Sequence, residues 1–403
     1  MDVLVLDTIH GGREIASEMR AAGDHVDEVD VYRGAEGVSV ETARTRSYDL
    51  IVAPVHLDPS HPLLGRTAPV CTHHEAVARL IGRDAPHPMI EVTGARGKTT
   101  TAHAIASLMP GTGILHTSAG TWRYPTHELL WKKSRTPASV IPAARQAYAD
   151  RGWCVAEVSL GVTGAGDVGV LTSAADYPIA AGKRRALAEK CASLGRAGTV
   201  VVPPGISLEA GSVISMDEIV STEGCVCRYD WNGVSGSYTC LLLGLEGYRQ
   251  PLMLATAVAC VLGIDPSPLA EFRALEGRMS TSRDGGVLIV DNANSGACVE
   301  TTCAAAHYAR DLSGEDEITL VIGAESRTIC EGFPVDEVAS AISAVSPSRV
   351  VFVGEYDEYE KLTASLGPEA VPMAYARTLD EAREVVRAQP AAGNIVLSVK
   401  SWR

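Results

Sequence analysis

Residues 87–111, HPMIEVTGARGKTTTAHAIASLMPG, constrain the fold of this chain more than any other segment. The apolar run 89–92 predicts a buried strand, and residues 102–109 predict a helix. Between them lies the small-residue turn 93–97, followed by the polar run 98–101. A strand, a glycine-containing loop and a helix together predict a phosphate-binding loop, because backbone N–H groups and the helix N-terminus both attract anions. A glycine-rich turn without a ligand is the alternative.

The loop also carries side chains suited to a nucleotide. Lys98 would reach the outer phosphates, and the Thr99 hydroxyl would ligate Mg²⁺. Val92 stands where the strict Walker pattern has a glycine, so the match is to the strand–loop–helix context rather than to the full pattern. We therefore expect ATP and Mg²⁺ as cofactors. The predicted nucleotide-binding residues of this loop are Gly94, Ala95, Arg96, Gly97, Lys98, Thr99 and Thr100.

A single charge interrupts a later apolar strand. Residues 153–160, WCVAEVSL, carry Glu157 at the end of a predicted buried strand. Burial of a carboxylate is costly unless a partner compensates it. In a protein with a phosphate loop that partner is expected to be Mg²⁺. A structural ion pair of Glu157 is the alternative.

Composition narrows the class of protein. A chain of 403 residues that is 46% hydrophobic is long enough for two or three domains. Its net charge of -14 argues against a nucleic-acid or anionic-membrane partner. No apolar run approaches the ~20 residues of a membrane span, and the opening residues run into a strand rather than a signal peptide. The cysteines are scattered without zinc-site spacing, so we expect a reduced, cytoplasmic protein.

The first segment alternates strands and helices, which predicts a parallel sheet. Its predicted strands are 3–6, 26–32, 49–55 and 69–71, with helices at 13–22 and 74–81. Polar loops follow the first and third strands, at the sheet edge where such folds bind ligands. Substrate binding and ordinary turn chemistry are both compatible with these loops. The candidate substrate-binding residues are Asp7, His10, Gly11, Gly12, His56, Asp58 and His61.

The rest of the chain continues the α/β pattern. The central segment has predicted strands at 89–92, 114–117, 153–160, 168–173 and 199–204, and a helix over 176–194 that carries Lys183 and Lys190. Short β segments follow in 205–243. The last segment alternates strands at 287–292, 318–323, 349–354, 371–375 and 394–399 with helices. We therefore predict three α/β domains, at 1–85, 86–282 and 283–403.

Several motifs, taken in order, resemble those of the Mur ligase family. TGARGKTTT (93–101) is similar to the family's TGTNGKTTT loop, and Thr136-Pro137 resembles its TTP motif. Glu157-Val158-Ser159 is similar to its E-x-S magnesium site. Gly277-Arg278-Met279 matches its G-R-M/F turn, and residues 291–295, DNANS, resemble its DYAHNP loop. The resemblance implies an ATP-dependent ligase with an N-terminal Rossmann-like substrate domain, a central P-loop ATPase and a C-terminal Rossmann-like lid.

The same resemblance assigns roles to individual residues. It implies catalysis by Lys98, Glu157, Lys190 and Arg278. It implies Mg²⁺ ligation by Thr99, Glu157 and Thr136, and further nucleotide contacts from Arg278, Asp291 and Asn294. Residues 176–190 resemble a segment that ends in a carbamylated lysine. Tyr177 replaces the family's histidine and the spacing is one residue shorter, so modification of Lys190 stays open.

The N-terminal loops resemble a particular branch of these enzymes. VLDTIHGGREIA (5–16) and DLIVAPVHLDPSHPLL (49–64) are similar to coenzyme F-430 synthases, Mur ligase relatives of methanogenic archaea. The resemblance implies that ATP activates a propionate of a nickel tetrapyrrole as an acyl phosphate, and that a carbon of the same molecule closes a ring. The partner would be that small molecule, with the oligomeric state open. An amide ligase adding an amino acid to a peptidoglycan or pseudomurein precursor, and a non-catalytic nucleotide-binding module, are the alternatives.

Overall fold

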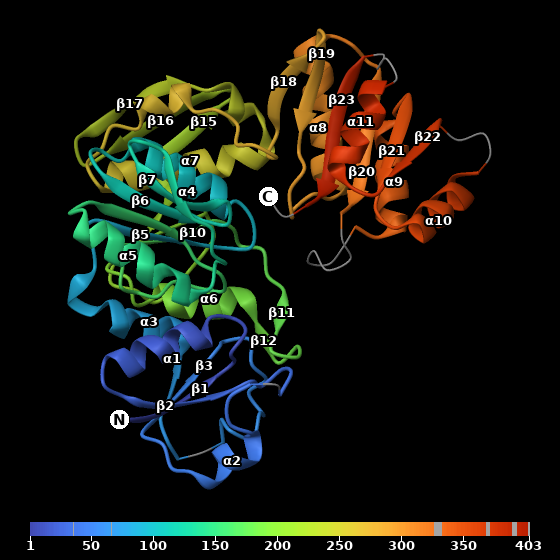
Figure 1. Ribbon diagram of the computed structural model, residues 1–403. Coiled ribbons are helices and arrows are strands. Elements are labelled where there is room, and N and C mark those ends of the chain that lie inside the picture. Colours follow the sequence, from blue (N-terminus) through green and yellow to red (C-terminus); the bar gives the residue numbers. More distant parts are fainter. Residues whose placement is uncertain (35, 66, 326–332, 368–370, 389–392, 402–403) are drawn as a thin grey trace. The chain divides into compact units, whose positions relative to one another are not determined.

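The computed structural model describes residues 1–403 except 35, 66, 326–332, 368–370, 389–392 and 402–403. The chain divides into two compact units, drawn in Figure 1. The first comprises Met1–Leu243 and Tyr248–Phe272, and the second comprises Gly244–Gly247 and Arg273–Arg403. Each unit is built from parallel strands and helices, which confirms the α/β class. The three-domain division at residues 85 and 282 stays a prediction.

The N-terminal sheet has the strand order β2-β1-β3-β4, and all its pairs are parallel. Its strands are β1 (Asp2–Leu6), β2 (His25–Val29), β3 (Leu50–Ala53) and β4 (Val70–Thr72). Its helices are α1 (Gly12–Ala21), α2 (Val40–Thr45) and α3 (His73–Ile81). From β1 the chain continues to β2 on one side, and from β2 it crosses back to β3 on the other side of β1. The direction in which strands are added therefore reverses between β1 and β3. Open α/β sheets take their ligands at such a reversal.

Alternate side chains of β1 pack into two different hydrophobic cores. Val3 and Val5 pack with α1 and α3, in a cluster that continues through α5 (Val140–Ala149) into the central sheet. Leu4 and Leu6 face the opposite side of the sheet, toward α2 and the loop after β3. Successive side chains of a strand point to opposite faces, so the unbroken apolar run of residues 3–6 indicates a strand buried on both faces. The shared apolar core explains why the N-terminal and central sheets form one unit.

The central sheet places the phosphate loop at its middle strand. Its order is β14-β13-β10-β5-β9-β6-β7-β8, and only β7 and β8 are antiparallel to their neighbours. The strands are β5 (Met89–Thr93), β6 (Gly113–Thr117), β7 (Gly120–Tyr124), β8 (Glu128–Trp131), β9 (Trp153–Glu157), β10 (Val168–Leu171), β13 (Thr199–Val202) and β14 (Val213–Ser215). Helix α4 (Lys98–Leu108) begins at Lys98 rather than at the predicted Ala102, because the Thr101 amide already bonds to the Gly97 carbonyl.

The predicted helix over 176–194 was wrong in its first half. Strands β11 (Pro178–Ile179) and β12 (Arg184–Arg185) form a small hairpin there, and α6 (Ala186–Leu194) starts after it. The hairpin turn, residues 180–182, has positive φ at every position, which a right-handed helix excludes. Lys183 therefore lies on the hairpin, and only Lys190 lies on the helix.

The remainder of the first unit is a small β layer and one long helix. Strands β15 (Val220–Glu223), β16 (Val226–Trp231) and β17 (Val234–Thr239) are antiparallel, and the predicted Asn232-Gly233 turn joins the last two. The helix is α7 (Glu246–Val261). In the part of the chain that the structure describes, no helix combines the length and apolar character needed to cross a membrane.

The second unit is one six-stranded sheet of order β18-β19-β23-β20-β21-β22. Its strands are β18 (Ser280–Asp284), β19 (Val287–Asp291), β20 (Ile318–Ala324), β21 (Arg349–Val353), β22 (Met373–Ala376) and β23 (Asn394–Lys400). Its helices are α8 (Val299–Ser313), α9 (Val335–Val345), α10 (Tyr356–Leu366) and α11 (Leu379–Ala388). Among the strands that the structure describes in this unit, only β18 is antiparallel, and the five predicted strands are all present.

Candidate functional site

The phosphate loop is fixed by two glycines between β5 and α4. Gly94 has φ 149°, and a Cβ there would lie 2.1 Å from the Thr172 Oγ1 atom. Gly97 has φ 81°, in the left-handed region that side chains other than glycine rarely adopt. The Thr172 hydroxyl donates to the Arg96 carbonyl at 2.5 Å. The loop is therefore held closely against the end of β10.

The hydrogen-bond donors of the loop have partners within the protein. The Ala95 and Arg96 amides donate to the Ser173 hydroxyl at 3.2 and 3.4 Å. The Lys98 ammonium donates to the Gly94 carbonyl at 2.9 Å, so it folds back over its own loop. Backbone amides and an ammonium group next to a helix N-terminus are the donors that bind phosphate oxygens.

Glu157 lies at the carboxyl end of β9, which adjoins β5, and its side chain is completely buried. Its Oε2 accepts hydrogen bonds from the Thr99 hydroxyl (2.8 Å) and the Ser118 amide (3.2 Å). Its Oε1 contacts Arg135 Nη1 at 3.3 Å. Burial works against ionisation, but the charges of Lys98 and Arg135 and these hydrogen bonds hold the pKa of Glu157 below its ordinary value.

The Thr99 hydroxyl and the Glu157 carboxylate are hard oxygen donors, the type that Mg²⁺ prefers. The ion pair with Arg135 is also compatible with a purely structural role of Glu157, so the metal role stays a prediction.

Thr136 follows Arg135, and its carbonyl accepts a hydrogen bond from the Ser139 amide at 3.1 Å. A Cβ on Gly11 would lie 2.8 Å from Thr136 Oγ1. The loop after β1 therefore packs against this segment of the central part.

Lys190 on α6 is fully buried, and its ammonium has no hydrogen-bond partner among the described residues. Its Nζ atom lies 4.6 Å from the centre of the Tyr177 ring. Burial, reinforced by the charge of Lys98, lowers the pKa of Lys190 to about 8. Its neutral form is therefore favoured relative to that of an exposed lysine. Its carbamylation and its catalytic role stay predictions.

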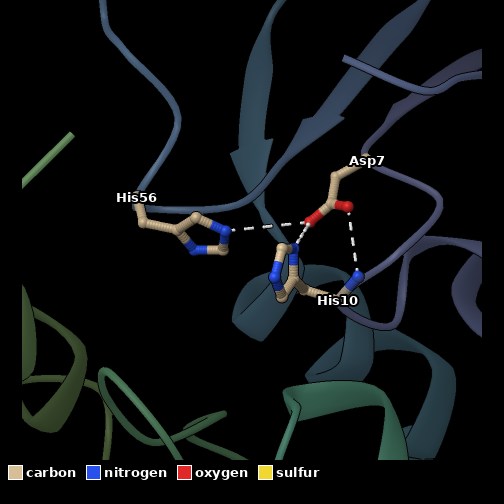
Figure 2. A group of neighbouring side chains, drawn as sticks. All are labelled: Asp7, His10 and His56. Carbon is tan, nitrogen blue, oxygen red and sulfur yellow. Dashed lines mark hydrogen bonds and ion pairs between the residues drawn. The ribbon is translucent and has the colours of Figure 1, made fainter. Parts of the chain in front are cut away.

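The N-terminal loops bring three of the predicted residues together, as Figure 2 shows. The buried Asp7 carboxylate lies 2.9 Å from His10 Nδ1 and 3.8 Å from His56 Nε2. The hydrogen bond to Asp7 raises the pKa of His10. Burial, and then the neighbouring His10, lower the pKa of His56. His10 and His56 pack edge to face, with ring centres 4.9 Å apart.

The loops after β1 and β3 carry the predicted substrate-binding residues, and we call these residues the N-terminal rim; its other members have structural partners in this unit. Asp58 accepts both of its ion-pair contacts from Lys183 Nζ, at 2.7 and 2.9 Å, and these bonds lower its pKa to about 2. His61 Nδ1 accepts the Leu63 amide at 3.4 Å. A Cβ on Gly12 would collide with the Asp7 carbonyl at 1.7 Å. The hairpin turn of β11 and β12 is therefore tied to the rim, and the role of these residues in substrate binding stays a prediction.

Some residues of the site were not predicted. Ser118, Thr172 and Ser173 contact the phosphate loop or Glu157. They follow β6 and β10, strands that flank the β5–β9 pair. The sequence does show polar residues directly after these apolar strands. Which of these residues reach the phosphate loop depends on the order of the strands in the sheet.

In the second unit, the loop after β19 folds onto the Gly277 turn. Asn294 Nδ2 donates to the Gly277 carbonyl at 2.6 Å, beside Arg278. Asp291 accepts the Ala293 amide at 2.9 Å and pairs with Arg383 Nη2 at 3.1 Å. Asp291 and Arg383 also line a cavity of about 840 Å³. The structure thus joins two predicted motifs of this unit, while their nucleotide contacts stay predictions.

Comparison with known proteins confirms the resemblance seen in the sequence. Residues 281–401 match the family described as coenzyme F430 synthetase CfbE, C-terminal domain. The chain is 29% identical to a coenzyme F(430) synthetase from Methanosarcina acetivorans, over 99% of this chain and 98% of that protein.

Solved structures confirm the architecture. A UDP-N-acetylmuramate–alanine ligase from Thermotoga maritima matches 99% of this chain and 95% of its own, with a TM-score of 0.54 and 15% identity. A MurF ligase from Thermotoga maritima in complex with ADP matches 90% of this chain and 87% of its own, with a TM-score of 0.50 and 13% identity. The fold is that of the Mur ligases.

Proposed function

We propose that this protein is a coenzyme F430 synthetase, an ATP-dependent ligase that activates a propionate of a nickel tetrapyrrole and closes a ring within the same molecule. The observation that carries this proposal is the length of the similarity, which covers 99% of the chain and 98% of the relative from Methanosarcina acetivorans. The similarity therefore includes the N-terminal loops, the phosphate loop and the C-terminal unit. A role in the cytoplasm of a methanogenic archaeon is part of this proposal.

The phosphate loop supports the ATP-dependent step. We infer that the Ala95 and Arg96 amides, now bonded to Ser173, turn to the phosphate oxygens, and that Lys98 leaves the Gly94 carbonyl for the outer phosphates. Phosphoryl transfer depends mainly on positioning and on neutralising the charge that spreads over the transferred group. Lys98 and Arg135 supply positive charge near Glu157 for this purpose.

The residues present fit a magnesium ion. Thr99 and Glu157 would hold it, because a hydroxyl and an ionised carboxylate are oxygen ligands and the carboxylate keeps its charge when buried. When bound, Mg²⁺ neutralises charge on the phosphate oxygens of ATP. Thr136 is proposed as a further ligand on the strength of the motif resemblance.

The activated carboxyl group must then react with a carbon and not with water. In the proposed reaction the carboxylate attacks the γ-phosphorus, ADP leaves, and the acyl phosphate forms. A C–H carbon of the macrocycle then gives up its proton, which is released to solution, and attacks the acyl carbon. The new C–C bond forms as the bond between the acyl carbon and the phosphate oxygen breaks and phosphate leaves. We propose that Arg278 contacts the nucleotide phosphates and that Asp291 and Asn294 complete the nucleotide site. Exclusion of water protects the acyl phosphate from hydrolysis.

Lys190 and the N-terminal rim complete the proposal. A buried amine with a pKa near 8 and no hydrogen-bond partner among the described residues suits either a charge near the phosphates or modification to a carbamate. The rim offers the imidazoles of His10 and His56, and the Lys183 ammonium that is paired with Asp58, to a molecule with several peripheral carboxylates, since these groups donate hydrogen bonds.

An amide ligase is the second candidate, because the fold is shared with a UDP-N-acetylmuramate–alanine ligase. ATP consumption measured against a panel of carboxylate substrates, with and without amino acids, tests the two. The proposed function requires ADP formation that depends on the nickel tetrapyrrole and not on an amine. Consumption that depends on an added amino acid would favour the amide ligase, and none with any substrate would favour a nucleotide-binding module.

A further inference from the structure

Two imidazoles and a carboxylate meet where the strand order of the N-terminal sheet reverses. Asp7 and His10 follow β1, and His56 follows β3. β1 and β3 are neighbours in the sheet. The connection from β1 leads to β2 on one side of the pair, and the connection from β3 leads to β4 on the other side. Figure 2 shows the Asp7 carboxylate directed at both imidazole rings from the base of the two loops. The side chains therefore converge at the place where this sheet type binds ligands.

The distances among the three groups are close to those of a metal centre. Asp7 Oδ2 lies 2.9 Å from His10 Nδ1 and 3.8 Å from His56 Nε2. One ligand atom from each residue lies within 4.8 Å of the others. Ligands about 2.0–2.2 Å from a first-row ion are separated by roughly 3–3.5 Å. The three ligand atoms therefore lie close to the separations that one shared ion requires.

Asp7 is held in place by its own loop. Its side chain is fully buried, and Oδ1 accepts the amides of Ile9 (2.8 Å) and His10 (3.1 Å), which leaves Oδ2 for the two imidazoles. Its φ of 82° is uncommon for a residue with a side chain. Strained backbone conformations concentrate at functional sites. The carboxylate is therefore fixed before any ligand arrives.

His56 supplies an independent observation. Its Nε2 atom is buried and has no hydrogen-bond partner among the residues that the structure describes. A buried polar atom without a partner is costly, so an unbonded ring nitrogen directed at a carboxylate needs an explanation. The ring is kept in position by stacking on Tyr32, with centres 5.9 Å apart, and by its edge-to-face contact with His10. A cation between His56 and Asp7 would satisfy it.

We propose that Asp7, His10 and His56 form a site for a divalent transition-metal ion such as Zn²⁺, Ni²⁺ or Co²⁺. Two imidazoles and one carboxylate are the ligand set that such ions prefer, whereas Mg²⁺ and Ca²⁺ prefer oxygen ligands alone. Side-chain exposure of 49% at His10 and 26% at His56 gives the ion a route from solvent. Three protein ligands leave coordination positions open for an oxygen or nitrogen atom of a small molecule.

The site is distinct from the predicted Mg²⁺ site at Thr99 and Glu157. The loop that carries it packs through Gly11 against Thr136, so both sites belong to the same compact unit. A metal-bound group at the rim and a nucleotide at the phosphate loop would therefore be held within one compact unit. The metal proposal does not depend on the identity of the substrate.

The test uses the full-length, tag-free protein after treatment with a chelator. Zn²⁺, Ni²⁺ and Co²⁺ are titrated separately by calorimetry, and the Co²⁺ complex is also followed by its visible absorption. We expect one equivalent to bind tightly, without the sulfur-to-metal charge-transfer band that cysteine ligation would give. His10→Ala and His56→Ala should each weaken binding by at least about tenfold, the effect of losing about 1.4 kcal/mol. Asp7→Asn keeps the side-chain shape and should weaken it similarly.

His61→Ala is the matched control, because His61 is on the same loop as His56 but its Nδ1 accepts the Leu63 amide. It should bind metal within about twofold of wild type. Melting curves establish that each variant is folded before its affinity is compared. The proposal is overturned if wild type binds no stoichiometric metal, or if folded His56→Ala binds as tightly as wild type. Because the titration contains metal alone, neither outcome bears on ATP-dependent turnover of the tetrapyrrole.

Discussion

The Thr99 hydroxyl donates a 2.8 Å hydrogen bond to Oε2 of Glu157, which links the start of α4 to the end of β9. Residues 58 positions apart in the chain thus form one buried polar pair beside the phosphate loop. The pair explains why a carboxylate is retained at the end of an otherwise apolar strand. The first two predictions concern Glu157 of this pair and Lys98, which precedes Thr99.

Lys98→Ala should abolish turnover without unfolding the protein. The Lys98 ammonium donates to the carbonyl groups of Gly94 and Ala95 in its own loop, and loss of one charge-stabilising group costs on the order of 10³-fold in phosphoryl transfer. Steady-state ATP consumption measures the effect, with Lys132→Ala, an exposed lysine, as the matched control. Activity within about tenfold of wild type would remove Lys98 from the mechanism.

Glu157→Gln should raise the Mg²⁺ concentration needed for half-maximal activity by about tenfold or more, with a smaller effect on melting temperature. Glutamine keeps an acceptor for the Thr99 hydroxyl but loses the charge that a metal ion requires. Magnesium titrations and melting curves on the same preparation provide the measurement. A large fall in melting temperature with an unchanged magnesium requirement would assign Glu157 to the ion pair with Arg135 alone.

His10→Ala combined with His56→Ala should raise the KM for the tetrapyrrole while leaving the affinity for ATP nearly unchanged. The two imidazoles lie on the N-terminal rim, whereas the predicted nucleotide contacts lie on the phosphate loop and in the second unit. Tetrapyrrole binding is followed by its visible absorbance, and ATP binding by calorimetry. If the double variant binds the tetrapyrrole as tightly as wild type does, the two histidines do not bind substrate and the polar residues of these loops only stabilise their turns.

Stability should fall as the pH drops from about 6.5 toward 4. His73 and His74 are buried, and burial lowers the pKa of each to about 4 from an ordinary 6.5. Between these values the unfolded state binds protons that the folded state excludes, so the stabilisation is complete above about pH 6.5 and is lost on acidification. Melting temperatures at pH 7 and pH 5 measure the change.

His74→Gln separates this effect from general acid destabilisation. Its amide can donate to the Ser159 carbonyl as the imidazole does at 2.9 Å, but it does not titrate. The difference in melting temperature between pH 7 and pH 5 should be smaller than in wild type. His25→Gln, at an exposed histidine, should keep the wild-type difference. An unchanged difference in His74→Gln would exclude His74 as a source of the pH dependence.

The strand–loop–helix context of Lys98 and the buried charge of Glu157 were predictable because both features are local in the sequence. The hairpin at Lys183 was not, since residues 176–194 carry a helical pattern and only the positive φ angles of the turn and the ion pair with Asp58 exclude a continuous helix. The contacts of Thr172 and Ser173 depend on β10 lying beside β5. Strand order is a property of the assembled sheet, and no single segment encodes it.

The convergence of His10 and His56 was predictable from the sequence only in part. Each loop was recognisable from its polar residues after an apolar strand, and the parallel sheet predicted that both lie on one edge. The direction of each side chain, and therefore the unbonded Nε2 of His56, depended on the fold of loops whose turns the sequence does not determine.

The most direct test of the central claim is the stoichiometry of ADP formation with the nickel tetrapyrrole as the only carboxylate substrate and with no amine present. The account predicts one ADP and one phosphate for each tetrapyrrole converted, a product lighter by one water, and no conversion with Lys98→Ala. Ring closure removes one water overall, because the carboxylic acid loses OH, keeping its other oxygen as the ketone, and the attacking carbon loses H. ADP formation only when an amino acid is added, with a product heavier by that amino acid, would contradict it.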